Sequence, residues 1–544
     1  MSKLSNRWLI LSGALVLLGL AYALNNPASE PFFNNDETRH VMTGVYFRDL
    51  LHDMPLRHLR DYTVHYYLQY PALGILVWPP FFYFTEGLLM SIFGTSFVVA
   101  KSLICLYACA ACAYLFFLIC RTHDTLRAAT AVLIFGLSPM VFRYSHHVMM
   151  EVPTLALGLA AIFYAVRYLD QEKRRDLMLA GLAAALTALT RYDAVYLLPF
   201  FLILLIARRR LTVLRRWEVL AAALVSALLV VPFYALTTAD LGWFHLQNTT
   251  VQYSAELPAV NSLRRIFFYP TCVPDQIGMF ALVPAMVGLV NGMMMKTERA
   301  RAWPYLAIIV ACYVTFTPMA EIEPRHTIYW IPAFALFASD GVAVLARWLR
   351  VPKIHLPLAA FLLLGIAWNT IAERQFFVRG YEEAARYVVA NSGQSRFCLF
   401  LGGLNGDFIY QVRHQDPDRR LWVLRADKIF YSVLVNPQVE YKEFAESDAD
   451  ILATVFKYDP EFIVIEDGPG AGTVVHAEER VRWILNHYPE RFRLERVVAV
   501  ESNNSAYQNM RLKIYRNIFR NENPERHLEI ELLMLRRNIQ TDAP

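Results

Sequence analysis

Charged residues are scarce in this chain of 544 residues, where Asp, Glu, Lys and Arg together make up 18%. A soluble globular protein carries about 25% charged residues, so the composition is displaced towards that of a membrane protein. Basic residues exceed acidic residues only slightly, since 52 Lys and Arg against 47 Asp and Glu give a formal net charge of +5. This balance argues against a nucleic-acid-binding protein, which needs a clustered basic surface. With 56% hydrophobic residues, the chain is predicted to be a polytopic membrane protein with one soluble part.

Motifs of the common cofactor and metal sites are also missing. The chain has no Walker loop, no GxGxxG motif that opens a βα unit and no HExxH motif, so no cofactor is expected. His147 and Glu151 stand four residues apart, but no third metal ligand is evident, and a divalent metal is not indicated. Five of the seven cysteines lie inside apolar runs, which excludes a secreted disulfide framework. We interpret them as small hydrophobic residues.

Long apolar stretches occur throughout the first two thirds of the chain. They run over residues 8–24, 96–120, 126–142, 152–169, 177–190, 193–207, 217–237, 275–295, 302–319, 327–346 and 354–371. We therefore expect about eleven passes across a hydrocarbon core of ~30 Å. The first stretch is followed by Asn25, Asn26 and Pro27 rather than by a small-residue cleavage pattern, which favours a retained span over a signal peptide.

The basic residues predict the orientation of these spans. If Lys3 and Arg7 are cytoplasmic, every other basic cluster also falls on the cytoplasmic side. The clusters are Arg121 and Arg127; Lys173, Arg174 and Arg175; Arg208, Arg209, Arg210, Arg215 and Arg216; Lys296, Arg299 and Arg301; and Arg347, Arg350 and Lys353. Residues 25–95 then form a long loop on the opposite, trans side, with interfacial helices expected at 36–53 and 79–93. Residues 372–544 are also placed on the trans side.

One predicted helical hairpin is too short to cross the membrane twice in full. Residues 177–207 must cross the membrane twice, and at 1.5 Å per residue two crossings need about 40 residues. The tip of the hairpin, Thr190-Arg191-Tyr192-Asp193, should therefore lie below the outer surface. Charged groups at that depth persist only inside the protein or in a water-filled cavity.

From residue 372 onwards the pattern becomes that of a soluble α/β domain. Helical runs at Tyr381–Ala390 and Glu478–His487 alternate with strand-like runs at Phe397–Leu401, Phe462–Ile465 and Val497–Val500. The chain is thus divided into a membrane domain, 1–371, and a soluble α/β domain, 372–544. The glycine-rich segment Gly402–Asp407 follows a strand, and we interpret it as a turn.

Three acidic residues at two places on the trans side are candidates for catalysis. Asp36 and Glu37 follow the first span directly; they either cap a helix or supply a general base that takes a proton from an acceptor. Glu151 begins the span after Ser138-Pro139; it either caps that span or orients groups beside Asp36.

Three cationic positions complete the candidates. Arg325, in the run Glu321–His326, is either an interfacial anchor paired with a carboxylate or a phosphate ligand. Arg191 at the hairpin tip is the better candidate for binding phosphate, and His326 follows Arg325 directly.

The order of these features resembles that of a known family. An N-terminal span is followed by Asp-Glu-Thr-Arg, an interfacial segment ending in Phe93-Gly94, Ser138-Pro139 before an acidic residue, a basic hairpin tip and a late Arg-His. Over residues 1–370 this order resembles the glycosyltransferase C (GT-C) superfamily, in the protein mannosyltransferase-like branch that includes the lipid A aminoarabinose transferase.

The resemblance implies an enzyme that transfers a sugar, with inversion, from a polyprenyl-phosphate donor to an acceptor on the trans side. It assigns Asp36 as the catalytic base with Glu37 beside it, and Glu151 as the second acidic position. Arg191 stands where the family has a lysine, and Arg325 or His326 where a late phosphate contact is expected.

The chain departs from the aminoarabinose transferase at one position, where Trp78 replaces a lysine before proline. This exchange removes a phosphate contact and suggests instead that Trp78 stacks on a sugar ring.

The expected partners are therefore a lipid-linked sugar, a lipid, glycan or protein acceptor and the lipid bilayer. The expected location is a bacterial inner membrane with a periplasmic active site. Three alternatives stay open: a protein O-mannosyltransferase-like enzyme, a secondary transporter and a scaffold that recruits partners through its C-terminal part. A transporter is disfavoured because the sequence shows no repeat and its charges gather on one side.

Overall fold

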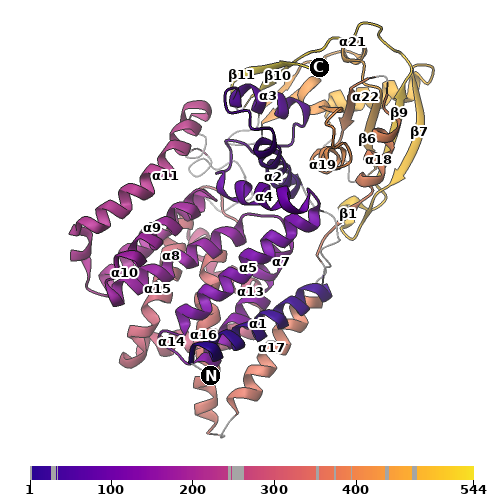
Figure 1. Ribbon diagram of the computed structural model, residues 1–544. Coiled ribbons are helices and arrows are strands. Elements are labelled where there is room, and N and C mark those ends of the chain that lie inside the picture. The colour runs from indigo at the N-terminus through magenta and orange to yellow at the C-terminus, as the bar shows by residue number, and fades with distance from the viewer. Residues whose placement is uncertain are drawn as a thin grey trace. The chain divides into compact units, whose positions relative to one another are not determined.

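The computed structural model describes residues 3–25, 32, 35–242, 247, 262–350, 354–372, 375–393, 395–434, 440–468, 475–533 and 535–543. The chain is mostly helical and forms two compact units (Figure 1). The helical unit comprises Met1–Ala28, Leu76–Phe82 and Lys101–Gln375. The mixed unit comprises Ser29–Ile75, Tyr83–Ala100 and Phe376–Pro544, so parts of the predicted trans-side loop belong with the C-terminal residues.

The helical unit is built from α-helices with short 3-10 segments, η1 to η3, between them. Its elements are α1 (Lys3–Asn25), α5 (Phe97–Ile119), α6 (Thr125–Leu137), α7 (Pro139–His146), α8 (Glu151–Gln171), α9 (Arg174–Ala188), η1 (Tyr192–Tyr196), α10 (Leu197–Ala207), η2 (Leu211–Arg215), α11 (Trp217–Leu241), α13 (Leu263–Ile277), α14 (Met279–Met294), α15 (Lys296–Phe316), η3 (Pro324–Trp330), α16 (Ile331–Leu349) and α17 (His355–Ala372).

The described residues contain six helices that are long and apolar enough to cross a membrane, or eight spans if two bent helix pairs each count as one. Helices α6 and α7 meet at 62°, where Pro139 begins α7, and α13 and α14 meet at 119° on either side of Gly278. Proline lacks the backbone donor that a continuous helix needs, and Gly278 has a φ of +86°, which glycine adopts without strain. A multi-pass membrane protein is confirmed, whereas the expected eleven passes are not.

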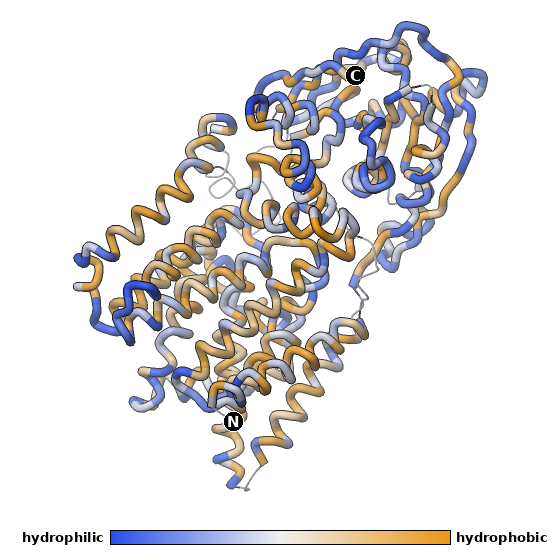
Figure 2. The backbone as a smooth tube through the Cα atoms, viewed as in Figure 1, coloured by the Kyte–Doolittle hydropathy of each residue, from blue (hydrophilic) through white to orange (hydrophobic). Residues whose placement is uncertain are grey.

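Several helices carry apolar side chains on their outer surface. On α11, Leu220, Leu224 and Leu228 are each more than 60% exposed. The tube coloured by hydropathy shows this helix as predominantly hydrophobic along its length (Figure 2). Such a surface is stable only when lipid covers it.

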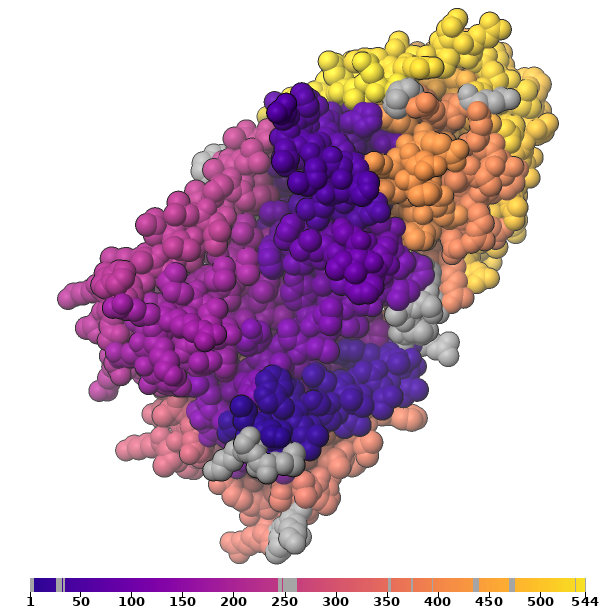
Figure 3. Space-filling model, viewed as in Figure 1, coloured from indigo at the N-terminus to yellow at the C-terminus, as the bar shows by residue number. Residues whose placement is uncertain are grey.

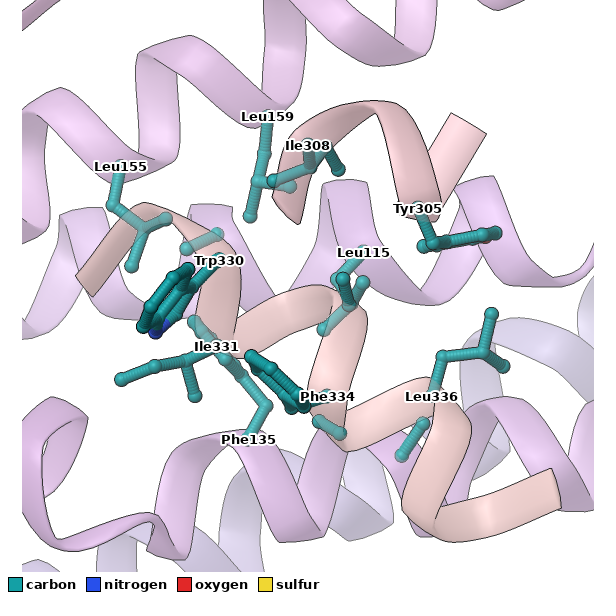
Figure 4. Close-up of a cluster of buried hydrophobic side chains, with 14 of the residues drawn as sticks. Leu115, Phe135, Leu155, Leu159, Tyr305, Ile308, Trp330, Ile331, Phe334 and Leu336 are labelled. Carbon is teal, nitrogen blue, oxygen red and sulfur yellow. The ribbon is translucent and has the colours of Figure 1, made fainter. Parts of the chain in front are cut away.

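The core of the helical unit surrounds α16. Its side chains pack with those of α5, α6, α8 and α15 in the cluster that contains Leu115, Phe135, Leu155, Leu159, Tyr305, Ile308, Trp330, Ile331, Phe334 and Leu336 (Figure 4). Glycines allow α14 and α16 to approach closely, because a Cβ atom at Gly341 would lie 1.8 Å from the carbonyl oxygen of Pro284. The indole of Trp330 donates a hydrogen bond of 2.6 Å to Gln276 on α13, which satisfies its buried polar atom.

The mixed unit contains an α/β domain, as the alternation of helical and strand-like runs predicts. Its main sheet has the order β3-β2-β6-β9-β7, in which β2 is parallel to β3 and β6, and β9 is antiparallel to β6 and β7. Three two-stranded sheets join β1 with β8, β4 with β5, and β10 with β11. The strands are β1 (Val378–Arg379), β2 (Phe397–Leu401), β3 (Trp422–Arg425), β4 (Tyr431–Leu434), β5 (Glu440–Glu443), β6 (Phe462–Asp467), β7 (Phe492–Ala499), β8 (Glu501–Ser502), β9 (Arg511–Asn517), β10 (His527–Leu532) and β11 (Arg537–Asp542). Strand β2 is buried along its whole length, as expected for a strand with two paired neighbours and helices on its faces.

The helices of the mixed unit come from both ends of the chain. They are α2 (Asn35–Asp53), α3 (Leu59–Gln69), α4 (Phe81–Phe93), α18 (Tyr381–Asn391), α19 (Asn405–Gln415), α20 (Ala426–Ile429), α21 (Asp448–Tyr458) and α22 (His476–His487), with a short 3-10 segment η4 (Ser505–Tyr507). Helix α2 is held to α19 by a buried ion pair of 2.6 Å between Asp49 and Arg413. Helix α3 packs against β11, and its indigo atoms border the yellow atoms of the last strands in the space-filling view (Figure 3). Helices thus form where interfacial helices were predicted.

Candidate functional site

The hairpin between α9 and α10 carries a buried charged tip. Helices α9 and α10 have 15 and 11 residues, so neither is long enough to cross a hydrocarbon core of ~30 Å. Between them, Arg191 has an extended backbone and is 2% exposed, and Asp193 is 1% exposed. The charges at the tip therefore lie inside the protein, as the length of the hairpin predicts.

Arg191 is held by carboxylates on both sides. Its Nη1 lies 2.7 Å from Oε1 of Glu151, and its Nε lies 2.7 Å from Oδ2 of Asp193. The hydroxyl of Tyr329 donates a further hydrogen bond of 3.2 Å to Asp193. Glu151 is the first residue of α8, where the helix dipole favours a negative charge. This network fixes the guanidinium of Arg191 beneath the surface.

Arg325 joins the same group from η3 and is more accessible. Its Nη1 lies 3.6 Å from Oε1 of Glu151, and its Nη2 donates a hydrogen bond of 3.0 Å to Glu323. The side chain of Arg325 is 22% exposed, whereas that of Arg191 is 3% exposed. Among the described residues, Oε2 of Glu151 has no hydrogen-bond partner. Of the two guanidiniums in this group, Arg325 is the one that a ligand in solution or lipid can reach.

An aromatic layer lies against the buried arginine. The ring of Trp78 stacks on that of Tyr192 with centroids 5.3 Å apart and an interplanar angle of 9°. The guanidinium carbon of Arg191 lies 5.5 Å from the centroid of the Trp78 ring. Trp78 is thus engaged with protein on one ring face, and its predicted stacking on a sugar stays a prediction.

The structure brings Glu151, Arg191, Arg325 and Trp78 together, and His326 lies near enough for the charges of this group to act on it. The Nδ1 atom of His326 lies 3.4 Å from the hydroxyl of Tyr269 on α13, and its ring packs beside Phe316. The pairing of Asp193 with Arg191 was not predicted from the sequence. A carboxylate two residues after an arginine at a buried tip is the signal that identifies it.

The mixed unit holds the other two candidates, Asp36 and Glu37, in the first turn of α2. The side chain of Asp36 is 54% exposed and lies 3.7 Å from Nη1 of Arg39. Glu37, in contrast, is fully buried. Only Asp36 of the two can contact an incoming substrate without rearrangement of the helix.

The glycine-rich segment that we interpreted as a turn has a positioning role. Asn35, the first residue of α2, donates through its side-chain amide to the carbonyl of Gly403. The backbone amide of Gly406 donates in return to Oδ1 of Asn35, at 3.0 Å. The C-terminal residues therefore fix the N-terminus of the helix that carries Asp36.

Metal-binding groups and cysteines add no further site. No group of three or more His, Cys, Asp or Glu side chains suited to a metal occurs within the described ranges. Cys109 and Cys112, which stand at CxxC spacing, lie in the apolar helix α5 as free cysteines. Their place in a hydrophobic helix favours a packing role.

Known proteins share both the local sequence and the fold. Residues 77–235, which include Trp78, Glu151 and Arg191, match the family model of dolichyl-phosphate-mannose-protein mannosyltransferases. The fold is similar to that of ArnT from Cupriavidus metallidurans bound to undecaprenyl phosphate, with a TM-score of 0.62 and 13% identity over 95% of this chain and 99% of that one. The family model thus covers part of the helical unit, and the structural likeness covers nearly the whole fold.

The fold is also similar to that of a second solved structure, with a lower TM-score. The archaeal oligosaccharyltransferase AglB from Archaeoglobus fulgidus, in complex with an inhibitory peptide and a dolichol-phosphate, matches with a TM-score of 0.52 and 11% identity over 86% of this chain and 70% of that one. No curated protein matches the sequence. The chain is therefore similar to a mannosyltransferase family over residues 77–235 and to two solved membrane-enzyme structures in its fold.

Proposed function

We propose that the enzyme transfers a sugar from a polyprenyl-phosphate donor to an acceptor hydroxyl or amine, with inversion at the anomeric carbon. The observation that carries this proposal is the accessible guanidinium of Arg325, held by Glu151 and Glu323 in a group whose second guanidinium is buried. Arginine binds phosphate through a planar fork of donors, and an oriented fork stabilises the charge that develops on a leaving phosphate. The names of the matched family and of the two structural neighbours support a lipid-phosphate donor.

Asp36 is proposed as the general base. It is the exposed carboxylate at the start of α2, and Arg39 stands beside it. A glycosidase also needs an acid to protonate its leaving oxygen. A polyprenyl phosphate leaves as an anion and needs no proton, so one carboxylate is sufficient.

The reaction then proceeds in a single displacement. Asp36 accepts the proton of the acceptor hydroxyl, and the acceptor oxygen forms a bond to the anomeric carbon. The bond between that carbon and the phosphate oxygen breaks with its electron pair, which leaves polyprenyl phosphate against Arg325. Proton transfer by a positioned carboxylate contributes about 10²–10⁴-fold to the rate of such steps. In this proposal Arg191 holds Glu151, which pairs with Arg325, and Glu37 supports α2. His326 is kept as a candidate for a further phosphate contact.

We also propose that catalysis takes place on the trans side of a bacterial inner membrane, because the basic loops gather on the other side. A protein O-mannosyltransferase-like reaction is the second candidate. It is favoured by the name of the matched family, dolichyl-phosphate-mannose-protein mannosyltransferase, whose model covers residues 77–235.

Transfer of labelled sugar from polyprenyl phosphate by the reconstituted full-length protein tests the proposal. Asp36→Asn should lower kcat about 10²–10⁴-fold and leave donor binding unchanged. Arg325→Met should raise the donor KM by about tenfold or more, since a charge-assisted hydrogen bond is lost.

Matched controls are available in each unit. Asp61→Asn changes a carboxylate that is 84% exposed in the mixed unit, and Arg174→Met changes an arginine that is 70% exposed in the helical unit. Both should retain wild-type kinetics. Turnover of Asp36→Asn at the wild-type rate would refute the role of Asp36 as general base. Movement of an intact lipid or solute without sugar transfer would favour a transporter.

A further inference from the structure

A cavity of about 690 Å³ lies between three helices of the helical unit. Its walls are formed by the first turns of α6, the last turns of α16 and the start of α17, and each of these helices packs against the other two. Ligand sites typically have volumes of about 300–1,000 Å³, so the cavity is large enough for a ligand. The basic loops predict these helix ends to be cytoplasmic, and Arg325 lies beyond the opposite end of α16. The cavity is therefore distinct from the candidate site described above.

The lining of the cavity changes from apolar to cationic along α16. Ser339 and Val342 are buried, whereas Arg347 and Arg350 are exposed at the end of the helix. At 1.5 Å per residue, the stretch from Ser339 to Arg350 is about 16 Å long. The apolar wall consists of Leu126, Val342, Ala343, Ala346, Leu356 and Ala359. One end of the cavity thus suits a hydrocarbon chain, and the other end suits an anion.

The three arginines of the lining are held differently. Arg127 lies 3.2 Å from Asp124 and 3.4 Å from Asp340, so its charge is compensated. Within the part of the chain that the structure describes, neither Arg347 nor Arg350 makes an ion pair or a side-chain hydrogen bond. Asp124 is the acidic residue of the lining, and it is already paired with Arg127. The cavity therefore has two cations whose donors are unused.

The position of these arginines favours a lipid as the ligand. Helices α16 and α17 are long and apolar enough to cross a membrane, so their ends lie at the level of the lipid headgroups. Between the two arginines, Trp348 and Leu349 are 68% and 56% exposed, and tryptophan is enriched at this interface. A soluble phosphate compound would pair with the arginines but leave the apolar wall uncovered. Basic pockets between membrane helices on the cytoplasmic side are typical sites for phospholipid headgroups.

We propose that the ends of α6, α16 and α17 form a binding site for an anionic glycerophospholipid of the cytoplasmic leaflet. Its phosphate lies against Arg347 and Arg350, and an acyl chain lies along Val342 and Ala346. A zwitterionic lipid binds less tightly, because its ammonium group compensates the phosphate charge that the arginines attract. This lipid contacts all three helices and stabilises the folded protein by mass action. The site does not depend on the proposed sugar transfer, and its test needs no turnover.

Native mass spectrometry of the full-length protein in detergent measures this preference directly. Phosphatidylglycerol should bind more tightly than phosphatidylcholine of the same chain length. The double variant Arg347→Gln/Arg350→Gln should weaken phosphatidylglycerol binding about 25-fold, since each basic residue near an anionic lipid contributes about fivefold. Equal affinities of the wild type for the two lipids would overturn the site.

A matched variant separates this site from the general attraction of a basic surface. Arg175 and Arg209 are exposed on the same predicted side and do not line the cavity, so Arg175→Gln/Arg209→Gln removes the same charge elsewhere. It should bind phosphatidylglycerol as the wild type does. Equal loss of binding in the two double variants would assign the effect to surface charge and overturn the proposal.

Thermal unfolding distinguishes lost binding from a folding defect. Without added lipid, both double variants should unfold at the wild-type midpoint, because Arg347 and Arg350 make no ion pair among the described residues. Phosphatidylglycerol should raise the midpoint of the wild type and of Arg175→Gln/Arg209→Gln, but not that of Arg347→Gln/Arg350→Gln. An equal rise in all three proteins would overturn the site.

The apolar wall and the source of the phosphate are tested separately. Ala343→Leu narrows the cavity without a change of charge and should weaken phosphatidylglycerol binding. Inorganic phosphate and glycerol phosphate should not displace the lipid, because they lack acyl chains. Unchanged binding in Ala343→Leu, or displacement by either soluble phosphate, would refute a lipid ligand. Displacement by an equimolar amount of undecaprenyl phosphate would assign the cavity to a polyprenyl lipid and refute the glycerophospholipid.

Discussion

The guanidinium of Arg191 lies 2.7 Å from the carboxylate of Glu151, and both side chains are almost completely buried. A charge in this position is stabilised by its partners rather than by solvent, and it is not available to a ligand unless the pair opens. The arrangement favours Arg191 as the positioning residue that orients Glu151, and through it Arg325. We therefore propose Arg325 as the phosphate contact that a ligand reaches first, and binding of phosphate by Arg191 stays a prediction.

Removal of one member of the buried network should destabilise the helical unit. Arg191→Met leaves Asp193 buried without its cation and leaves Glu151 with only the looser pair to Arg325 at 3.6 Å, so it should lower the free energy of unfolding by about 3–5 kcal/mol. Glu151→Gln should lower the free energy of unfolding by less, because Asp193 still pairs with Arg191 at 2.7 Å. Thermal unfolding of the detergent-solubilised protein measures both changes.

An exposed ion pair provides the control for this comparison. Arg386→Gln removes a pair with Glu382 in which both side chains are more than half exposed, so it should change the unfolding free energy by only about 0–1 kcal/mol. Equal stability of Arg191→Met and Arg386→Gln would show that the buried pair has an additional partner, such as water, that replaces the guanidinium.

Trp78 should act through Tyr192 and Arg191 in the free enzyme. Trp78→Phe keeps an aromatic ring against Tyr192 and should keep most of the stability, whereas Trp78→Ala removes both the stacking and the contact with the guanidinium. Aromatic pairs and cation–π contacts are each worth about 0.5–1.5 kcal/mol, so a loss of about 1–3 kcal/mol is expected for Trp78→Ala. Calorimetry of the two variants checks this order. Loss of affinity for the sugar-loaded donor but not for polyprenyl phosphate alone would instead support the predicted stacking on a sugar.

The mixed unit should become less stable as the pH rises through neutrality. Burial raises the pKa of Glu466 to about 7, against the opposite effect of hydrogen bonds from the Tyr381 hydroxyl and from the amides of Leu404 and Gly403. A raised pKa means that the folded state binds the proton more tightly than the unfolded state does. The stability from this group is complete below about pH 4 and is lost as the pH rises through about 7.

The neighbouring carboxyls act in the same direction. Burial, followed by Glu37 and Glu466, raises the pKa of Asp407, and burial also raises that of Glu478. Hydrogen exchange of the β2 and β6 amides should therefore speed up between pH 5.5 and 8 beyond its intrinsic dependence on pH. Glu466→Gln should flatten this additional slope. A slope that is unchanged in the variant would assign the effect to Asp407 or Glu478.

The sequence predicts most of the local structure because the signals for it are local. Apolar runs, basic loops and the short hairpin identify the membrane helices and the buried tip at Arg191. Strand β2 occupies Phe397–Leu401 as expected, since five consecutive apolar residues suit a strand that is covered on both faces. The number of apolar stretches differs from the number of spans for two reasons. Helices α9 and α10 are each too short to cross the membrane, and the chain bends within two further helix pairs, one of them at Gly278.

Long-range contacts account for what the sequence could not predict. Nothing in the composition of Gly402–Asp407 indicates that its backbone binds Asn35, which lies 371 positions before Gly406. The partners of Arg191 likewise come from α8 and from the tip itself, and only folding reveals that Glu151 is buried beside them.

The contact between the glycine-rich segment and α2 gives the most selective prediction. A Cβ atom at Gly406 would lie 2.2 Å from Oγ1 of Thr38 and 3.0 Å from Oδ1 of Asn35. Gly406→Ala should therefore displace the first turn of α2, which carries Asp36, at a cost of about 1–3 kcal/mol that the better helix propensity of alanine partly offsets. We expect kcat for sugar transfer to fall more steeply than stability, because a displaced base loses its reach.

Two further variants decide whether the displacement is the cause. Gly393→Ala, at a position with no atom within 4 Å of the added Cβ, should behave as wild type. Thr38→Ala removes the hydroxyl that the new methyl group meets, so the double variant Thr38→Ala/Gly406→Ala should recover much of the lost kcat. If the double variant stays as slow as Gly406→Ala, the glycine matters for the first turn of α19 itself, and the C-terminal residues do not act through the position of Asp36.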